Sequence, residues 1–93
     1  MAITGTAILN FGSAPGTNYV TTTVTGQSAI VSGSNVEAFM MGNDFTSDHN
    51  VIEHQLVPMT IRCGNIVGGS GFDISVASEY RLTGTFNIRW VWA

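Results

Sequence analysis

The sequence contains no lysine, and this absence excludes two kinds of chemistry. A Walker-type phosphate-binding loop requires a lysine, and Schiff-base catalysis requires a lysine amine. The only permanent cations are three scattered arginines, which six acidic residues outnumber to give a formal net charge of −3. Because nucleic-acid binding needs a clustered basic footprint, the sequence predicts no nucleic-acid partner.

Charge of either sign is scarce. Only 10% of the residues are charged, whereas soluble domains usually carry about 25%. The surface must therefore consist largely of threonine, serine, asparagine and glycine. Such a surface favours a protein that is buried against other subunits, and the sequence predicts a homo-oligomer. A monomer with a hydroxyl-rich β surface is the alternative.

Cysteine and long apolar runs are also lacking. Cys63 is the only cysteine, so no internal disulfide can form. It alternates with Val57, Met59 and Ile61, which predicts a small core hydrophobe and not a nucleophile. No apolar run approaches the roughly 18 residues of a membrane-spanning helix, and the first residues show no signal-peptide pattern. We expect no membrane partner and assembly in the cytoplasm.

The clearest positive feature is the final segment of the chain. Phe86, Ile88, Trp90 and Trp92 alternate with smaller or polar residues, and both tryptophans of the protein lie among them. A period of two is that of a strand with one buried face. The segment is therefore expected to form part of the core, where truncation harms folding.

Similar short segments follow one another along the whole chain. Turn residues separate them about every 8–12 residues, and no useful 3.6-residue stripe occurs. The segments expected to form strands are residues 3–11, 19–25, 36–41, 51–63 (two short strands or one bent strand), 72–77 and 81–92, with a short apolar run at 29–31 and a glycine-rich hairpin connection at 64–71. This pattern predicts one all-β domain over residues 1–93, an antiparallel β-sandwich, Ig-like or jelly-roll-like, of about seven or eight short strands.

One segment concentrates the groups that carry chemistry. It contains Asp44, Asp48, His49, Glu53 and His54. The spacing fits neither His-Glu-x-x-His nor His-x-x-Glu-His, and on a strand Glu53 and His54 would point to opposite faces. We therefore predict no metal ion, no cofactor and no catalytic residue. The long loop at 42–50 is expected to contact a partner through Asp48 and His49.

Two apolar residues are further candidates for partner contact. Phe39 and Met41 share one face of their expected strand with Glu37. If that face points outward, it forms an apolar patch rimmed by charge, which is the profile of an association site.

Arg89 is the last candidate for partner contact. It lies on the outward face of the final strand, and arginine is favoured at protein interfaces. An ordinary cross-strand pair with Glu79 or Asp73 is the plainer alternative.

Short motifs along the whole chain are familiar together. They are FGSAPGTN at 11–18, TVTGQ at 23–27, VEAF at 36–39, DHN at 48–50 with EH at 53–54, CGN at 63–65, GF at 71–72, RLTG at 81–84 and RWVW at 89–92. The set resembles a family of short proteins encoded by tailed bacteriophages and prophages. The resemblance implies a virion-associated structural protein from the head–tail gene region, with no catalytic residues to transfer.

These observations lead to one expected function and two alternatives. We expect a non-enzymatic bacteriophage virion structural protein, a multi-copy head decoration or cement protein that binds the major capsid protein in the virion. The first alternative is a tail or neck component, including a receptor- or glycan-binding module lined by Tyr19, Trp92 and the Asp/His loop. The second is a metal-dependent hydrolase that uses Asp48, His49, Glu53 and His54.

Overall fold

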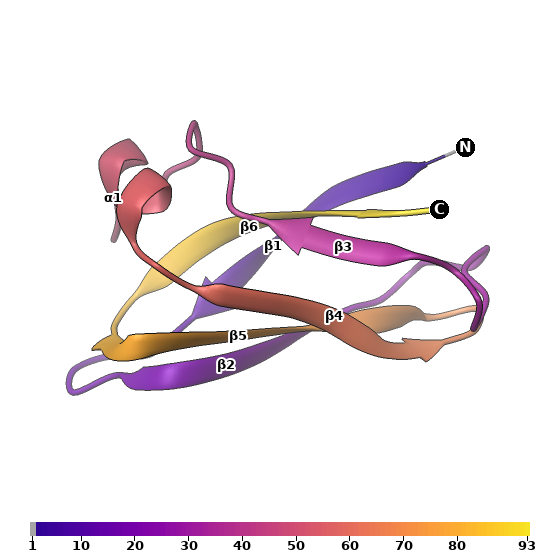
Figure 1. Cartoon of the computed structure of the whole chain (residues 1–93), viewed down its shortest axis with the longest axis horizontal. Coiled ribbons are helices and arrows are strands. Elements are labelled where there is room, and N and C mark those ends of the chain that lie inside the picture. Colours follow the sequence, from indigo (N-terminus) through magenta and orange to yellow (C-terminus); the bar gives the residue numbers. More distant parts are fainter. Residues whose placement is uncertain (1) are drawn as a thin grey trace.

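Two antiparallel sheets of three strands each pack face to face in the computed structural model, which describes residues 2–93 (Figure 1). The first sheet has the order β1–β6–β3, formed by β1 (Ile3–Asn10), β6 (Thr85–Trp92) and β3 (Val36–Phe39). The second has the order β2–β5–β4, formed by β2 (Thr17–Val24), β5 (Gly71–Leu82) and β4 (Thr60–Val67). The predicted all-β sandwich is confirmed, with six strands in the described part.

The strand count is lower than expected because two apolar segments are not strands. The segment expected as one bent strand or two short ones begins instead with a helix, α1 (Val51–Leu56), and only its end belongs to β4. The apolar run at 29–31 is a loop that places Ile30 in the core with 1% of its surface exposed. The glycine-rich hairpin connection is also shorter than expected, since β4 continues to Val67 and β5 begins at Gly71.

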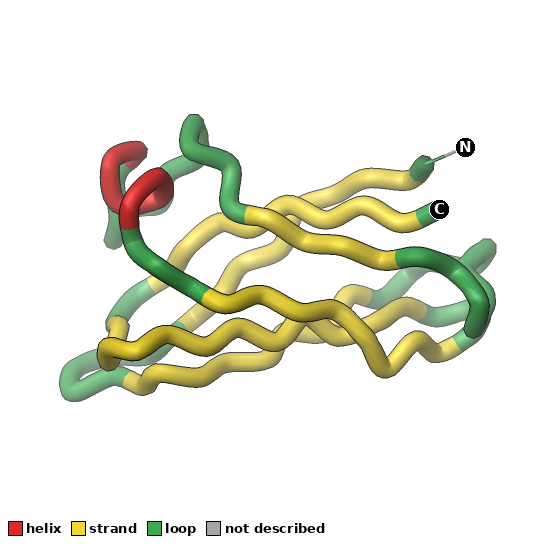
Figure 2. Tube along the Cα trace, in the orientation of Figure 1, coloured by secondary structure: helices red, strands yellow, loops and turns green. Residues whose placement is uncertain are grey.

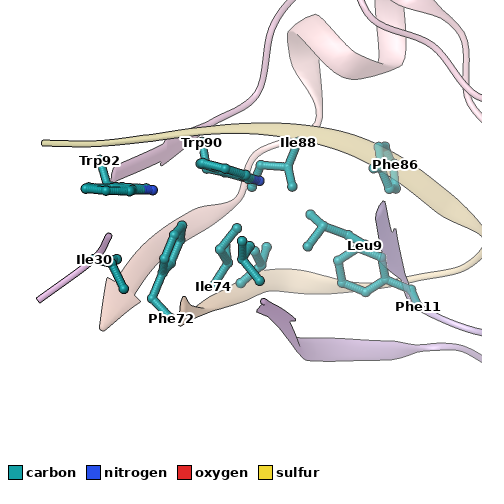
Figure 3. Packing of buried hydrophobic residues seen from close by; sticks show 11 residues of the cluster. Leu9, Phe11, Ile30, Phe72, Ile74, Phe86, Ile88, Trp90 and Trp92 are labelled. Atoms are coloured by element: carbon teal, nitrogen blue, oxygen red, sulfur yellow. The ribbon is translucent and has the colours of Figure 1, made fainter. Parts of the chain in front are cut away.

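Alternating burial along β6 builds the core, as the sequence predicts. Phe86 and Ile88 are fully buried, and Trp90 and Trp92 are 6% and 8% exposed. They face buried side chains of the other sheet and its neighbouring loops, among which Phe72 meets Trp90 edge to face with ring centroids 5.6 Å apart (Figure 3). A sandwich core of this kind needs alternate residues of both inner faces to interdigitate.

The indole of Trp90 determines which residue β1 can carry opposite it. Gly5 pairs with Trp90 in the ladder, and a Cβ at Gly5 would lie 2.2 Å from the indole ring. Glycine is therefore required there for packing. The indole Nε1 of Trp90 also donates to the carbonyl oxygen of Thr6 (3.3 Å), so the ring covers the strand and reaches its edge.

The segment between β3 and β4 contains α1 and the loops on either side of it. It connects edge strands of different sheets, and Figure 2 shows its helix and loops beside the first sheet, near the end of the sandwich opposite the two chain ends. We call residues 42–56, which comprise this loop and α1, the clasp.

The burial pattern of β6 predicts that substitutions on its inward face lower the free energy of unfolding much more than substitutions on its outward face. Trp90→Ala removes a buried indole and should lower the free energy of unfolding by about 3–5 kcal/mol. Deletion of residues 90–93 should abolish cooperative folding. Val91→Ala, on the outward face of the same strand, should cost less than about 1 kcal/mol. Urea titration followed by circular dichroism measures all three, and a cooperatively folding deletion variant would contradict the expectation.

Candidate functional site

The polar groups of the clasp attach it to the β5–β6 turn and to β6. The Oδ2 atom of Asp48 accepts hydrogen bonds from the backbone N–H (2.9 Å) and the hydroxyl (2.7 Å) of Thr85. The Thr85 hydroxyl, followed by its backbone N–H, lowers the pKa of Asp48. Gly84, at φ +75°, lets the turn approach, since a Cβ there would lie 2.8 Å from the Cβ of Asp48. Asp48 thus holds the turn in place.

His49 is set between acceptors on both sides of its ring. Its Nδ1 faces Oε2 of Glu53 at 2.9 Å and its Nε2 faces the carbonyl oxygen of Thr83 at 2.6 Å. The ring stacks on Phe86, with centroids 3.9 Å apart and an angle of 12° between the planes. Burial opposes a charge here, but the bonds to Thr83 and Glu53 outweigh it and raise the pKa of His49. Since both nitrogens meet acceptors, the geometry suits the imidazolium form.

His54 has the opposite arrangement. Its side chain is 2% exposed and is the only buried polar side chain among residues 2–93. Its Nδ1 lies 3.0 Å from the carbonyl oxygen of Asn50, and its Nε2 accepts the backbone N–H of Asn87 at 3.0 Å. One nitrogen must donate and the other must accept, so the partners assign the neutral tautomer with the proton on Nδ1. His54 therefore fastens α1 to an N–H of β6 that lies beyond the end of β3.

The helix itself starts at a capping box. The Asn50 side chain accepts from the backbone N–H of Glu53 (2.9 Å), and the Glu53 side chain accepts from the backbone N–H of Asn50 (3.0 Å). This reciprocal pair satisfies two otherwise free donors at a helix N-terminus. The Asn-x-x-Glu spacing is visible in the sequence, and it is the signal that the interpretation of 51–63 as two short strands or one bent strand overlooked.

The residues considered for a metal centre do not form one. Within residues 2–93, no group of three or more histidine, cysteine, aspartate or glutamate side chains is placed to hold an ion. Cys63, expected as a small core residue, is half-buried against the core, and burial raises the pKa of its thiol.

The outward face of the β1–β6–β3 sheet has an ion pair at its centre. Arg89 donates from Nε to Oδ2 of Asp44 (3.0 Å) and from Nη2 to Oδ1 (2.8 Å). This fork-shaped contact lowers the pKa of Asp44 and raises that of Arg89. The alternative pairing of Arg89 with Glu79 or Asp73 is wrong, because both of those residues lie on the other sheet while the clasp brings Asp44 across β6.

Apolar side chains surround this ion pair. Phe39 and Thr6 flank Arg89 from the two neighbouring strands, and Ile8 flanks Asn87 in the next row. Asn87 in turn donates from Nδ2 to the carbonyl oxygen of Phe45 (2.6 Å). We call the exposed members of this group the apolar face: Ile8 (49% exposed), Phe39 (41%), Met41 (39%) and Phe45 (65%).

The apolar face contains two of the five predicted contact residues and surrounds a third. Phe39 points outward from β3 together with Glu37, as expected, and Met41 follows just after the strand. Arg89 lies among them, whereas Asp48 and His49 bond to the β5–β6 turn. Sequence reasoning missed Phe45 because it sits in a polar loop, and missed Ile8 because its strand alternates weakly.

The outward face of the second sheet is different in character. It carries a chain of hydroxyl and carboxylate contacts, in which Tyr19 bonds Thr21 (2.7 Å) and Thr21 bonds Ser75 (3.3 Å). Thr23 donates to Asp73 at 2.7 Å, and this bond, after that from Asn65, lowers the pKa of Asp73. The hydroxyl and carboxylate groups of this face therefore hydrogen-bond to one another.

Two open hollows border the clasp. One of about 430 Å³ is lined mainly by apolar residues between the helix end and the start of β4, together with His54. The other, of about 550 Å³, lies at the β5–β6 turn beside Asp48 and His49. In both, the histidine ring nitrogens are already hydrogen-bonded within the chain.

Comparison with protein-family models, with curated protein sequences and with solved structures finds no match to this chain. In the part of the chain that the structure describes, no helix is long and apolar enough to cross a membrane.

His54 provides a test of how the clasp is held. His54→Leu should leave the backbone N–H of Asn87 without its acceptor and lower the free energy of unfolding by about 1–3 kcal/mol. Ile52→Ala, on an exposed position of the same helix, should change it by less than about 0.5 kcal/mol. Chemical denaturation of the two variants measures the difference, and equal effects would contradict this role of His54.

His49 predicts a pH dependence of stability. Because its folded-state pKa is raised, protonated His49 adds stability that is complete below the unfolded value of about 6.5 and disappears as pH rises through the folded pKa. The pKa values of Asp48 and Glu53 are lowered, so their contributions stay constant in this range. The free energy of unfolding should fall as pH rises above about 6.5, and His49→Gln should flatten that slope. An unchanged slope in the variant would refute the assignment.

Proposed function

We propose that this chain is a non-enzymatic structural protein of a bacteriophage virion that binds a major capsid or tail protein through the apolar face. Within that class, the role we propose is that of a multi-copy head decoration protein. The observation that carries the binding role is the combination of exposed apolar side chains around the Arg89–Asp44 pair on one side of a rigid sheet.

The arrangement of this face supports protein binding in two ways. Aromatic and arginine side chains at the centre of a patch are the residues that dominate interface energies. The fork-shaped contact with Asp44 holds the guanidinium in one position before a partner arrives, which reduces the entropy lost on binding. The apolar side chains remain free, so they would be the groups desolvated by a partner.

The polar side chains of the clasp support the same proposal, because their hydrogen-bonding groups are used within the chain. The side chains of Asp48, His49 and His54 bond within the chain and fasten the clasp to the sandwich. A rigid β module of this kind suits repeated attachment to a particle, where many copies make modest single interfaces sufficient. The phage setting is supported by the sequence resemblance alone.

Copy number in the virion tests the role. Quantitative mass spectrometry is applied to particles purified from the phage or induced prophage that encodes the chain. A high copy number is expected and supports head decoration or a tail tube. A handful of copies would replace head decoration by a neck or tail-tip role. Absence from the particles would overturn the structural role.

The apolar face predicts which substitutions prevent incorporation. Phe39→Asp combined with Met41→Asp places charge where desolvation is expected and should reduce binding to particles lacking the protein by at least about tenfold. Tyr80→Asp is the matched control, since Tyr80 is 63% exposed on the other sheet. Sedimentation of particles with labelled variants measures binding, after circular dichroism confirms folding. Equal binding of the two variants would exclude the apolar face.

A further inference from the structure

Strand β1 is a sheet edge whose outward backbone groups have no backbone partner among residues 2–93. In an antiparallel ladder, alternate residues bond to the neighbouring strand and the others point away from it. The N–H of Phe11 donates to Gly84 of the turn (2.9 Å), and the N–H of Asn87, paired with Ile8, donates away from β1 to His54. The N–H and C=O groups of Thr4, Thr6 and Ile8 therefore point out of the sheet.

The other three edge strands, β2, β3 and β4, carry features that discourage pairing with a further strand, whereas β1 carries none of these features. Strand β3 has only four residues and includes Glu37. Strand β4 carries Arg62 and an irregular register after Gly64, where Asn65 has φ +51°. Strand β2 is uncharged but has an irregularity between Thr17 and Tyr19. Short length, charge and bulges are the usual means by which proteins protect sheet edges.

Strand β1 has the features of a strand that pairs. Its register with β6 is unbroken from Ile3 to Asn10, and it contains no charge and no proline. The three outward-pointing residues Thr4, Thr6 and Ile8 are all β-branched and exposed, which favours extended pairing. Ile8 is 49% exposed at this edge and belongs to the apolar face.

We propose that β1 pairs with β1 of a second copy of this chain, antiparallel about a two-fold axis at Thr6. The two three-stranded sheets then form one continuous six-stranded sheet. Thr6 lies opposite Thr6 of the other copy, and each Thr4 lies opposite Ile8. The second copy is the occupant that the strand favours, because an uncharged strand meets its own image without repulsion and closed two-fold pairs are the commonest oligomers.

The contact between Trp90 and the edge is compatible with this pairing. The indole of Trp90 already donates to the carbonyl oxygen of Thr6. A carbonyl has two lone pairs, so the same oxygen accepts the N–H of Thr6 from the other copy. The indole comes from the buried side of β6, where Trp90 is 6% exposed.

The pairing adds to the proposed function the way in which two copies of the chain contact each other. It rests on the proposed function only in assuming that many copies assemble on one particle. Its failure is distinguishable from failure of that function. A chain that does not dimerise can still bind particles through Phe39 and Met41, and a dimer can form from a chain that is absent from particles.

Charge substitutions at the two-fold axis test the pairing. Sedimentation velocity over a concentration series should show dimers for the parent chain. Thr6→Lys and Thr6→Glu should each be monomers, because like charges then face each other, and an equimolar mixture of the two should restore the dimer. Thr60→Lys is the matched control, an exposed threonine on edge strand β4, and should dimerise like the parent chain.

Amide exchange gives a second readout that does not depend on the variants. The amides of Thr4, Thr6 and Ile8 should exchange quickly in dilute parent protein and slow at high concentration. A parent chain that stays monomeric, a dimer unaffected by Thr6→Lys, or a mixture that fails to reassociate would each overturn pairing at this edge. Protection of these amides only when a different protein is added would assign the edge to that protein and also overturn self-pairing.

Discussion

Burial of alternate side chains on β6 is the constraint on which the rest of the structure depends. This strand lies between β1 and β3, and its inward residues Phe86 to Trp92 fill the space between the sheets. Because a strand presents its two faces in strict alternation, burial of those residues places Asn87 and Arg89 on the outside. The core thereby determines where the polar anchors of the clasp must be. One strand supplies both the hydrophobic core and the attachment points.

Side chains of the clasp bond to three successive outward residues of β6. His54 accepts the N–H of Asn87, Asp48 holds Thr85, and Asp44 holds Arg89. A short helix of six residues has little stability of its own, so these contacts and the capping box must keep it in place. The consequence for function is that the titratable side chains of the clasp are hydrogen-bonded or ion-paired within the chain. The exposed large apolar side chains on this side include those of the apolar face.

The two sides of the first sheet offer different kinds of contact. The apolar face presents side chains, and a partner must match their shape. The edge of β1 presents backbone groups, and any extended strand of suitable register can match them. Ile8 belongs to both, so a second copy paired along β1 would extend the apolar face across the two-fold axis. An assembly built in this way would present two adjacent copies of that face to one particle surface.

Local periodicity was enough to predict the class of fold. The alternation of Phe86, Ile88, Trp90 and Trp92 and the outward threonines of β2 are visible in the sequence because burial of one strand face repeats every second residue. Helix α1 was also encoded locally, by Asn50 and Glu53, but its apolar residues satisfy a strand pattern equally well, and only docking through His54 decided between them. The partner of Arg89 and the opposite hydrogen-bonding states of His49 and His54 were decided by tertiary structure alone. Each depends on which loop reaches which strand across more than thirty residues of chain, and no local pattern contains that distance.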